Sequence, residues 1–181
     1  MGKRGILSSS RHVLLVSTLA LLCASATAAA PASSAAAGTP CTFEYDAIAS
    51  PGLSSSPSSG TVTTNGETGT ATCNGPVNGK EPTGPGKIGS DGRYGIKSGA
   101  TCQSGGDGAG TTTFTIPTSS GDEHVTIRYT ATFGGLKNGV FSGQYEGDRM
   151  SGTYDATPQD GDCVSRPVTK FHVKGKGTLT G

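Results

Sequence analysis

The sequence contains few of the residues on which many binding and catalytic sites are built. It has no tryptophan, and only 6% of its residues are aromatic, which argues against a carbohydrate-binding module with flat stacking platforms. No CxxC pair or Cys/His cluster occurs, so a zinc ligand set is missing. No Gly-x-Ser-x-Gly motif marks a hydrolase nucleophile. We therefore predict neither a metal nor a cofactor.

The chain has a single long apolar run, Val13–Ala24, and it follows the basic residues Lys3, Arg4 and Arg11. A run of about a dozen residues fits the core of a signal peptide and is shorter than the ~20 residues that span a bilayer. We predict a signal peptide at residues 1–28, a secreted, extracellular protein and no membrane span.

Loss of that segment changes the charge balance. The sequence has 14 Lys+Arg against 13 Asp+Glu, and removing the three basic residues leaves 11 against 13, a net charge of −2. Nucleic-acid binding, which uses a basic surface, is therefore not expected. Residues 29–40, rich in Ala, Ser and Pro, are predicted to be a tether. Residues 41–181 are predicted to form one β domain, which we expect to be monomeric.

Four cysteines remain in the predicted domain: Cys41, Cys73, Cys102 and Cys163. In an exported chain an even set of this kind predicts two disulfides, for which three connectivities are possible. We favour Cys73–Cys102 together with Cys41–Cys163, and the other two connectivities stay open.

Apolar and polar residues alternate through much of the domain. From Val125 to Phe133 the alternation is strict, which predicts a half-buried strand. We place hairpin turns at Ser120-Gly121 and Asn65-Gly66, and no helical signal of useful length appears. The pattern predicts an all-β fold, an antiparallel up-and-down barrel of about eight strands stapled by disulfides, with a β-sandwich as the alternative.

The segment FSGQYEGDRMSGTY, residues 141–154, predicts a hairpin with a type II′ turn at Gly147-Asp148. That turn would pair Tyr145 with Met150, Gly143 with Gly152, and Phe141 with Tyr154. Facing glycines could leave a hollow for a ligand, or they could permit bending or be covered by neighbouring aromatic rings. The candidate ligand-binding residues are Phe141, Gly143, Tyr145, Met150, Gly152 and Tyr154.

Two polar clusters invite chemical interpretations. Residues 122–124, Asp-Glu-His, lie beside a predicted turn, where they could perform acid–base chemistry but would ordinarily be solvated. Lys170, His172, Lys174 and Lys176 share the outward face of the last predicted strand. This ladder could dock an anion, although we favour protection of an edge strand.

Two segments carry a resemblance to a group of known proteins. They are GKIGSDGRYGIKSGATCQSGGDGAGTTTFTIPT, with its Gly-x-Tyr-Gly strand and a Gly-rich loop after Cys102, and GDCVSRPVTKFHVKGKGTLTG. Together they resemble small exported β-rich proteins of actinobacteria, a group without an assigned activity. The resemblance implies export, disulfides and one domain, and it transfers no catalytic residue. In outline the predicted barrel is also similar to lipocalin-like and allene-oxide-cyclase-like barrels.

These observations favour an exported, non-enzymatic β domain that binds a small apolar ligand or an extracellular surface partner. One alternative is a small cofactor-free enzyme, a cyclase or hydrolase, working at a barrel mouth near His124. Another is a protease inhibitor that presents the Pro/Gly-rich loop at residues 74–92.

Overall fold

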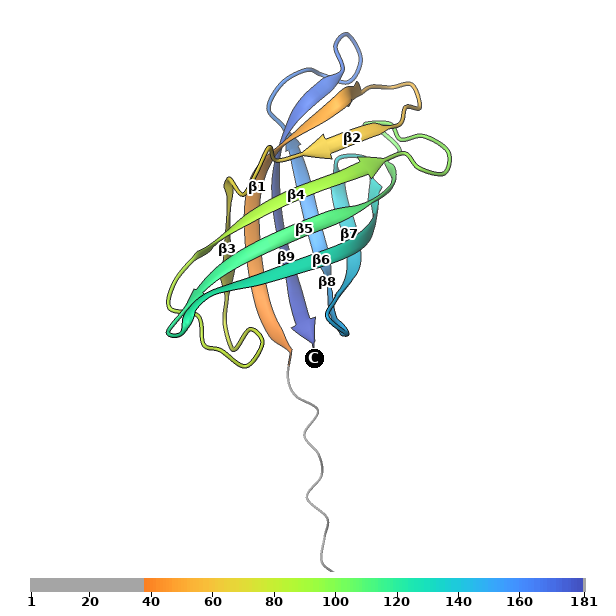
Figure 1. The fold of residues 1–181 in the computed structure, drawn as a ribbon. Helices are drawn as coiled ribbons and strands as arrows, with labels where there is room; N and C mark the ends of the chain where they lie inside the picture. The colour runs from red at the N-terminus through yellow and green to blue at the C-terminus, as the bar shows by residue number, and fades with distance from the viewer. Residues whose placement is uncertain (1–37, 181) are drawn as a thin grey trace, which may run out of the picture. The chain divides into compact units, whose positions relative to one another are not determined.

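The computed structural model describes residues 38–180, and these residues form nine β-strands and no helix (Figure 1). The strands are β1 (Thr39–Leu53), β2 (Gly60–Thr63), β3 (Gly69–Cys73), β4 (Gly86–Tyr94), β5 (Gly106–Thr118), β6 (Gly121–Gly134), β7 (Lys137–Tyr145), β8 (Asp148–Pro158) and β9 (Val168–Thr180). The predicted signal peptide and most of the predicted tether lie outside the described residues, while β1 begins at Thr39, within the tether. Between residues 38 and 180, no helix is suited to crossing a membrane.

The strands form one antiparallel sheet that closes on itself. Each strand from β4 to β9 pairs with the next, and β9 pairs with β1 along almost its whole length. β2 and β3 share a single position between β1 and β4, so the nine strands of the described residues fill eight positions in the ring. The predicted all-β barrel of about eight strands is therefore confirmed, in preference to the sandwich.

β2 and β3 do not form the hairpin that we predicted at Asn65-Gly66. Both strands are antiparallel to β1, so they run in the same direction, and residues 64–68 bulge out between them. Thr64 fixes the bulge, because its backbone N–H donates to the Ser90 carbonyl and its hydroxyl accepts from the Ser90 N–H, both at 2.9 Å. Asn65 has the left-handed conformation that Asn-Gly favours, with φ of 56°, but this local preference does not specify which strands pair.

The β7–β8 hairpin differs from the prediction in its register. Its turn residues are Glu146 and Gly147, both with positive φ (44° and 96°), as a type I′ turn requires. Consequently Gly143 faces Met150, Phe141 faces Gly152 and Gly139 faces Tyr154. The predicted pairing of the two glycines is wrong, although every side chain lies on the predicted face because the slip is two residues along one strand.

The β5–β6 hairpin has the same two-residue slip. Its turn is formed by Ser119 and Ser120, so Phe114 faces Val125, whereas the predicted turn at Ser120-Gly121 would have paired Phe114 with Ile127. Gly121, with φ of 112°, follows the turn instead of lying in it. In both hairpins the alternation identified the inward face, and the turn residues were placed one position too late.

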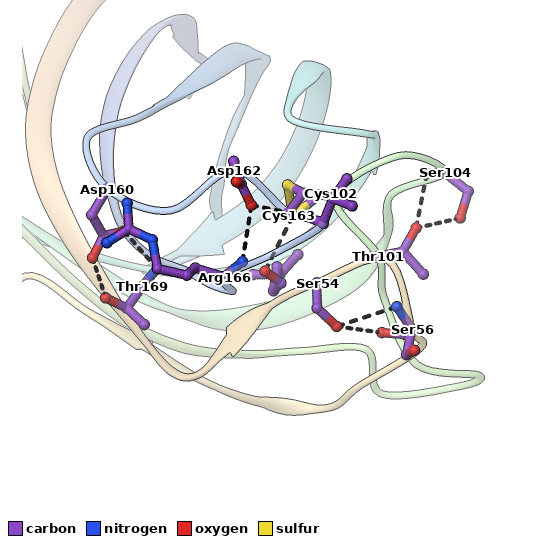
Figure 2. Close-up of a disulfide and its surroundings, with 12 residues drawn as sticks. Ser54, Ser56, Thr101, Cys102, Ser104, Asp160, Asp162, Cys163, Arg166 and Thr169 are labelled. Atoms are coloured by element: carbon purple, nitrogen blue, oxygen red, sulfur yellow. Dashed lines mark hydrogen bonds between the residues drawn. A yellow bond between two sulfur atoms is a disulfide. The ribbon is translucent and has the colours of Figure 1, made fainter.

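The two disulfides are Cys41–Cys73 and Cys102–Cys163, so the connectivity that we favoured is wrong. Cys41 and Cys73 face each other directly across β1 and β3. Cys102 and Cys163 join two loops (Figure 2). Spacing along the sequence did not reveal that β3 lies beside β1, and that adjacency decides the first pair.

The barrel has two unlike ends. At one end lie the start of β1, the end of β9 and the tight β5–β6 and β7–β8 turns (Figure 1). At the other end lie loops 54–59, 95–105 and 159–167 and the β6–β7 turn. We call the second end the stapled end, because Cys102–Cys163 joins two of its loops.

Candidate functional site

Glycines and large side chains alternate around the inner face of the barrel. A Cβ atom at Gly139 would overlap the ring of Tyr154, and one at Gly175 would overlap the ring of Phe43. The side chain of Ile127 covers Gly143 in the same way. A glycine in a strand commonly marks such a close approach, so the inner glycines are the surfaces on which the large side chains rest.

A hollow above facing glycines is one of the interpretations that the sequence leaves open, and it does not apply because Gly143 and Gly152 do not face each other. Ile127 lies over Gly143, and a Cβ at Gly152 would collide with the backbone of β9 at Lys176. Gly143 and the largely buried Tyr145 border a separate pocket that they share with His124. The other three candidate residues, Phe141, Met150 and Tyr154, do line an internal cavity, which lies elsewhere in the barrel.

This cavity has a volume of about 130 Å³ and occupies the middle of the barrel. Most of its lining is apolar and comes from strands on every side of the ring. The apolar lining residues are Phe43, Ala47, Leu53, Val62, Ile88, Phe114, Ile127, Ala131, Phe133, Leu136, Phe141, Met150, Ala156, Phe171 and Val173. A barrel of eight strands either fills its interior or holds one small ligand, and this barrel leaves space.

The cavity extends towards the β6–β7 turn at the stapled end. Phe133 and Leu136, on either side of that turn, line the cavity and are partly exposed. Leu53, Ala100 and Val168, at the same end, are covered by their neighbours, with 3% or less of their surface exposed. We therefore place the mouth of the cavity beside the β6–β7 turn.

Four tyrosines line this apolar space, and the hydroxyl of one of them, Tyr94, donates to the Pro51 carbonyl. We call the other three the tyrosine cluster: Tyr45 of β1, Tyr129 of β6 and Tyr154 of β8. Burial raises the pKa of all three phenols. The charge that Tyr129 or Tyr154 would carry raises the pKa of Tyr45 further, so the three phenols are close neighbours. At neutral pH all three are uncharged, and each can donate one hydrogen bond.

Two alcohols extend the tyrosine cluster. The Thr112 hydroxyl donates to Ser90 Oγ at 3.1 Å, and Ser90 Oγ lies 3.4 Å from the Tyr129 hydroxyl. A hydrogen bond with Ser90 also lowers the pKa of Tyr45, opposing part of the effect of burial. The Tyr129 hydroxyl would lie only 2.6 Å from a Cβ at Gly92, so the glycine there makes room for it.

Tyr154 differs from the other two members of the cluster. Within residues 38–180 its hydroxyl has no hydrogen-bond partner, and its oxygen is not fully enclosed, since the one enclosed side-chain atom without a partner is Ser58 Oγ. Tyr154 thus lines the cavity with a hydroxyl that no group in residues 38–180 bonds. The sequence pointed to Tyr154 as a candidate ligand-binding residue but not to Tyr45 or Tyr129, because the three come from distant strands.

His124 lies outside the cavity, on the outer face of β6. Its Nδ1 is 3.1 Å from the Thr115 hydroxyl, which donates to Glu67 at 2.6 Å. Glu123 is paired with Lys80 at 2.6 Å, and that hydrogen bond lowers the pKa of the carboxyl. His124 lines a second pocket together with Arg128 and Tyr129, and neither Glu67 nor Glu123 borders it, so His124 has no carboxylate partner of this cluster in that pocket.

The strand β9, which carries the cationic ladder of Lys170, His172, Lys174 and Lys176, is not an edge strand. β9 is paired on both sides, so the interpretation as edge protection is wrong. Lys174 lies 3.1 Å from Glu44, and His172 Nδ1 lies 2.8 Å from Asp46, both on β1. The neighbouring carboxylates balance part of the charge that would attract an anion.

Two aspartates fold the β8–β9 loop at the stapled end (Figure 2). Asp162 accepts hydrogen bonds from the Ser165 hydroxyl and from the backbone N–H groups of residues 164–166, which hold its pKa well below the usual range. Asp160 accepts from Thr169 and Lys170, which lowers its pKa too. In the part of the chain that the structure describes, no three His, Cys, Asp or Glu side chains gather to hold a metal ion.

Among residues 38–180, few large apolar side chains are exposed. The exposed large apolar side chains lie singly on separate elements: Ile48, Ile96, Val140 and Val164. The loop proposed as an inhibitor segment is shorter than 74–92, because β4 begins at Gly86. It is held in place by Val77, which is only 1% exposed, and by the Thr39 hydroxyl, which donates to the Pro76 carbonyl.

The resemblance to exported actinobacterial proteins stays an expectation. No protein-family model, no curated protein and no solved structure matches this chain.

Proposed function

We propose that this chain is an exported binding protein that holds one small, largely apolar molecule inside its barrel. The observation that carries the proposal is the cavity of about 130 Å³, with its apolar lining and its mouth beside the β6–β7 turn. An apolar cavity of about 150 Å³ engineered into another protein is known to bind benzene. The space here is therefore of the size that accepts one small ring.

Binding is favoured over catalysis by the titratable groups at the cavity. The tyrosine cluster has raised pKa values, so its members are poor bases and poor nucleophiles at neutral pH. The side chain of Arg93, which borders the cavity, is exposed on the outside of the barrel. His124 and its neighbouring carboxylates are on the outer face, so the cavity is left without an evident acid–base pair.

Secretion is part of the same proposal. The two disulfides suit an oxidising compartment outside the cytosol. The segment at 1–28 has the composition of a signal peptide.

Titration of the exported protein with benzene, followed by NMR, tests the proposal. We expect saturable shifts of cavity methyl groups such as those of Ile127 and Met150. Ala131→Leu, which adds side-chain volume to the cavity, should abolish binding. Thr132→Leu is the matched control, because Thr132 is the next residue on β6 and is exposed. The proposal fails if the unmodified protein gives no saturable shifts, or if both variants bind benzene as it does.

A further inference from the structure

The hydroxyl groups inside the barrel are unusual neighbours for so apolar a cavity. An eight-stranded barrel that only needed to exclude water could use phenylalanine at these positions. Instead Tyr45, Tyr129 and Tyr154 reach the same space from three walls. The Tyr154 hydroxyl is partly buried and has no hydrogen-bond partner among residues 38–180, so its hydrogen is free to bond a molecule in the cavity.

We propose that the molecule held in the cavity carries one neutral oxygen acceptor, such as a ketone carbonyl, which accepts a hydrogen bond from the Tyr154 hydroxyl. This inference rests on the proposed function, since it names the ligand class of the same cavity. The ligand that fits is a small ring with a single carbonyl or ether oxygen.

The count of donors within the cluster favours an acceptor. Ser90 and Thr112 join the three phenols, and each of these groups carries one O–H hydrogen. The hydrogen bonds among these groups connect Thr112 to Ser90 and Ser90 to Tyr129, and Ser90 also lowers the pKa of Tyr45. Each bond uses one hydrogen, so the cluster holds more hydrogens than internal bonds, and Tyr154 is outside all of them. A ligand that brings only donors would leave these hydrogens unused.

The absence of charge at the cavity favours a neutral acceptor. Among the described residues, Arg93 is the one charged residue that borders the cavity, and its side chain is exposed on the outer face. A carboxylate ligand would therefore be taken out of water without a cation, which is strongly unfavourable. A cation would have aromatic faces around it but no carboxylate, and the three neutral phenols would direct hydrogen atoms toward it.

Cyclohexanone and methylenecyclohexane form a matched pair of probes. They have nearly the same shape, and one carries C=O where the other carries C=CH₂. We would measure the affinity of both for the exported protein and for its Tyr154→Phe variant by NMR titration. Comparing the variant with the unmodified protein for each probe removes the difference in how the two probes are solvated in water.

We expect Tyr154→Phe to weaken cyclohexanone binding by about 3- to 10-fold, the usual worth of one neutral hydrogen bond, and to leave methylenecyclohexane binding unchanged or improved. Tyr145→Phe is the control, because Tyr145 is buried but does not line the cavity, and it should change neither affinity.

The possible failures are distinguishable. If neither probe binds the unmodified protein, the proposed function itself is wrong. If both bind and Tyr154→Phe changes both affinities equally, the cavity binds ligands but the acceptor inference is overturned. Tighter binding of tetramethylammonium than of cyclohexanone would also overturn it, in favour of a cation held by aromatic faces.

Discussion

Glycine residues inside the barrel determine where the aromatic rings can lie. Tyr154 rests on Gly139, and Phe43 rests on Gly175. In each case the ring belongs to the residue directly opposite the glycine on the paired strand. Because these rings lie directly against the glycine backbones, replacing such a glycine with alanine should lower the stability of the fold. Replacing a glycine that has open space above it should not.

Gly139→Ala should destabilise the protein by roughly 1–3 kcal/mol, because a Cβ at that position overlaps the ring of Tyr154. Gly134→Ala is the control, since Gly134 also lies in a strand but a Cβ there meets nothing within 4 Å. Urea unfolding curves of both variants would measure the difference. Equal unfolding free energies for the two variants would contradict the packing of Tyr154 on Gly139.

The tyrosine cluster should make stability fall at alkaline pH. Burial raises the folded-state pKa of Tyr45, Tyr129 and Tyr154 above the ordinary value of 10.0. The unfolded chain therefore releases these protons first, and the stabilisation present below pH 10 is lost as the pH rises through and above that value. Urea midpoints measured from pH 8 upward should decline, and Tyr154→Phe should decline less steeply. A flat profile for the unmodified protein would rule out buried neutral phenols.

At the scale of the strands, the alternation of apolar and polar residues identified which face of a strand is buried but not which residues pair across strands. The inward residues of β6, from Val125 to Phe133, were predictable because a strand with one buried face must alternate. The registers of β5–β6 and β7–β8 were each misplaced by two residues, a slip that leaves alternation intact and so cannot be detected by it. The cysteine pairing was missed for a similar reason, because it depends on which strands are adjacent.

The Cys102–Cys163 disulfide should be worth about 4 kcal/mol, because it closes a loop of 61 residues in the unfolded chain. The double variant Cys102→Ala/Cys163→Ala should show that loss in denaturant unfolding. It should also show faster amide exchange in loops 95–105 and 159–167, which few other bonds hold together, than in the strands. Uniformly faster exchange across the whole barrel would contradict a local role at the stapled end.

The Cys41–Cys73 disulfide provides the comparison, with a sequence separation of 32. Its removal should cost a similar amount, lower by about 0.6 kcal/mol from the shorter loop alone. Because β1 and β3 are already paired through the residues beside it, amide exchange at their junction should change little compared with the stapled end.

At the scale of the whole molecule, closure of the barrel stabilises the fold, while the cavity inside it lowers the stability. A closed ring of eight positions could bury more apolar surface if its interior were full. The class of fold could be predicted from the sequence, because successive hairpins with one apolar face lead to few architectures. The cavity could not, because it depends on how side chains from β1, β4, β6 and β8 fit together across the ring.

Ala131→Leu should therefore stabilise the protein while it abolishes ligand binding. Filling a cavity commonly adds about 0.5–2 kcal/mol, and Ala131 lines this one. Thermal unfolding without ligand would reveal the gain, and the NMR titration with benzene would reveal the loss. A destabilised Ala131→Leu variant would mean that the space at this position is already filled.

Closure of the ring also imposes an order in time. β1 is the first strand of the barrel and β9 is the last, and the two pair through residues as distant as Thr39 and Leu179. When the chain is synthesised from its amino end, one side of β1 stays unpaired until the 13 residues of β9 have been made. Contacts between such distant residues form slowly, so the cavity does not exist until the barrel is complete, and no partly emerged chain can hold a ligand.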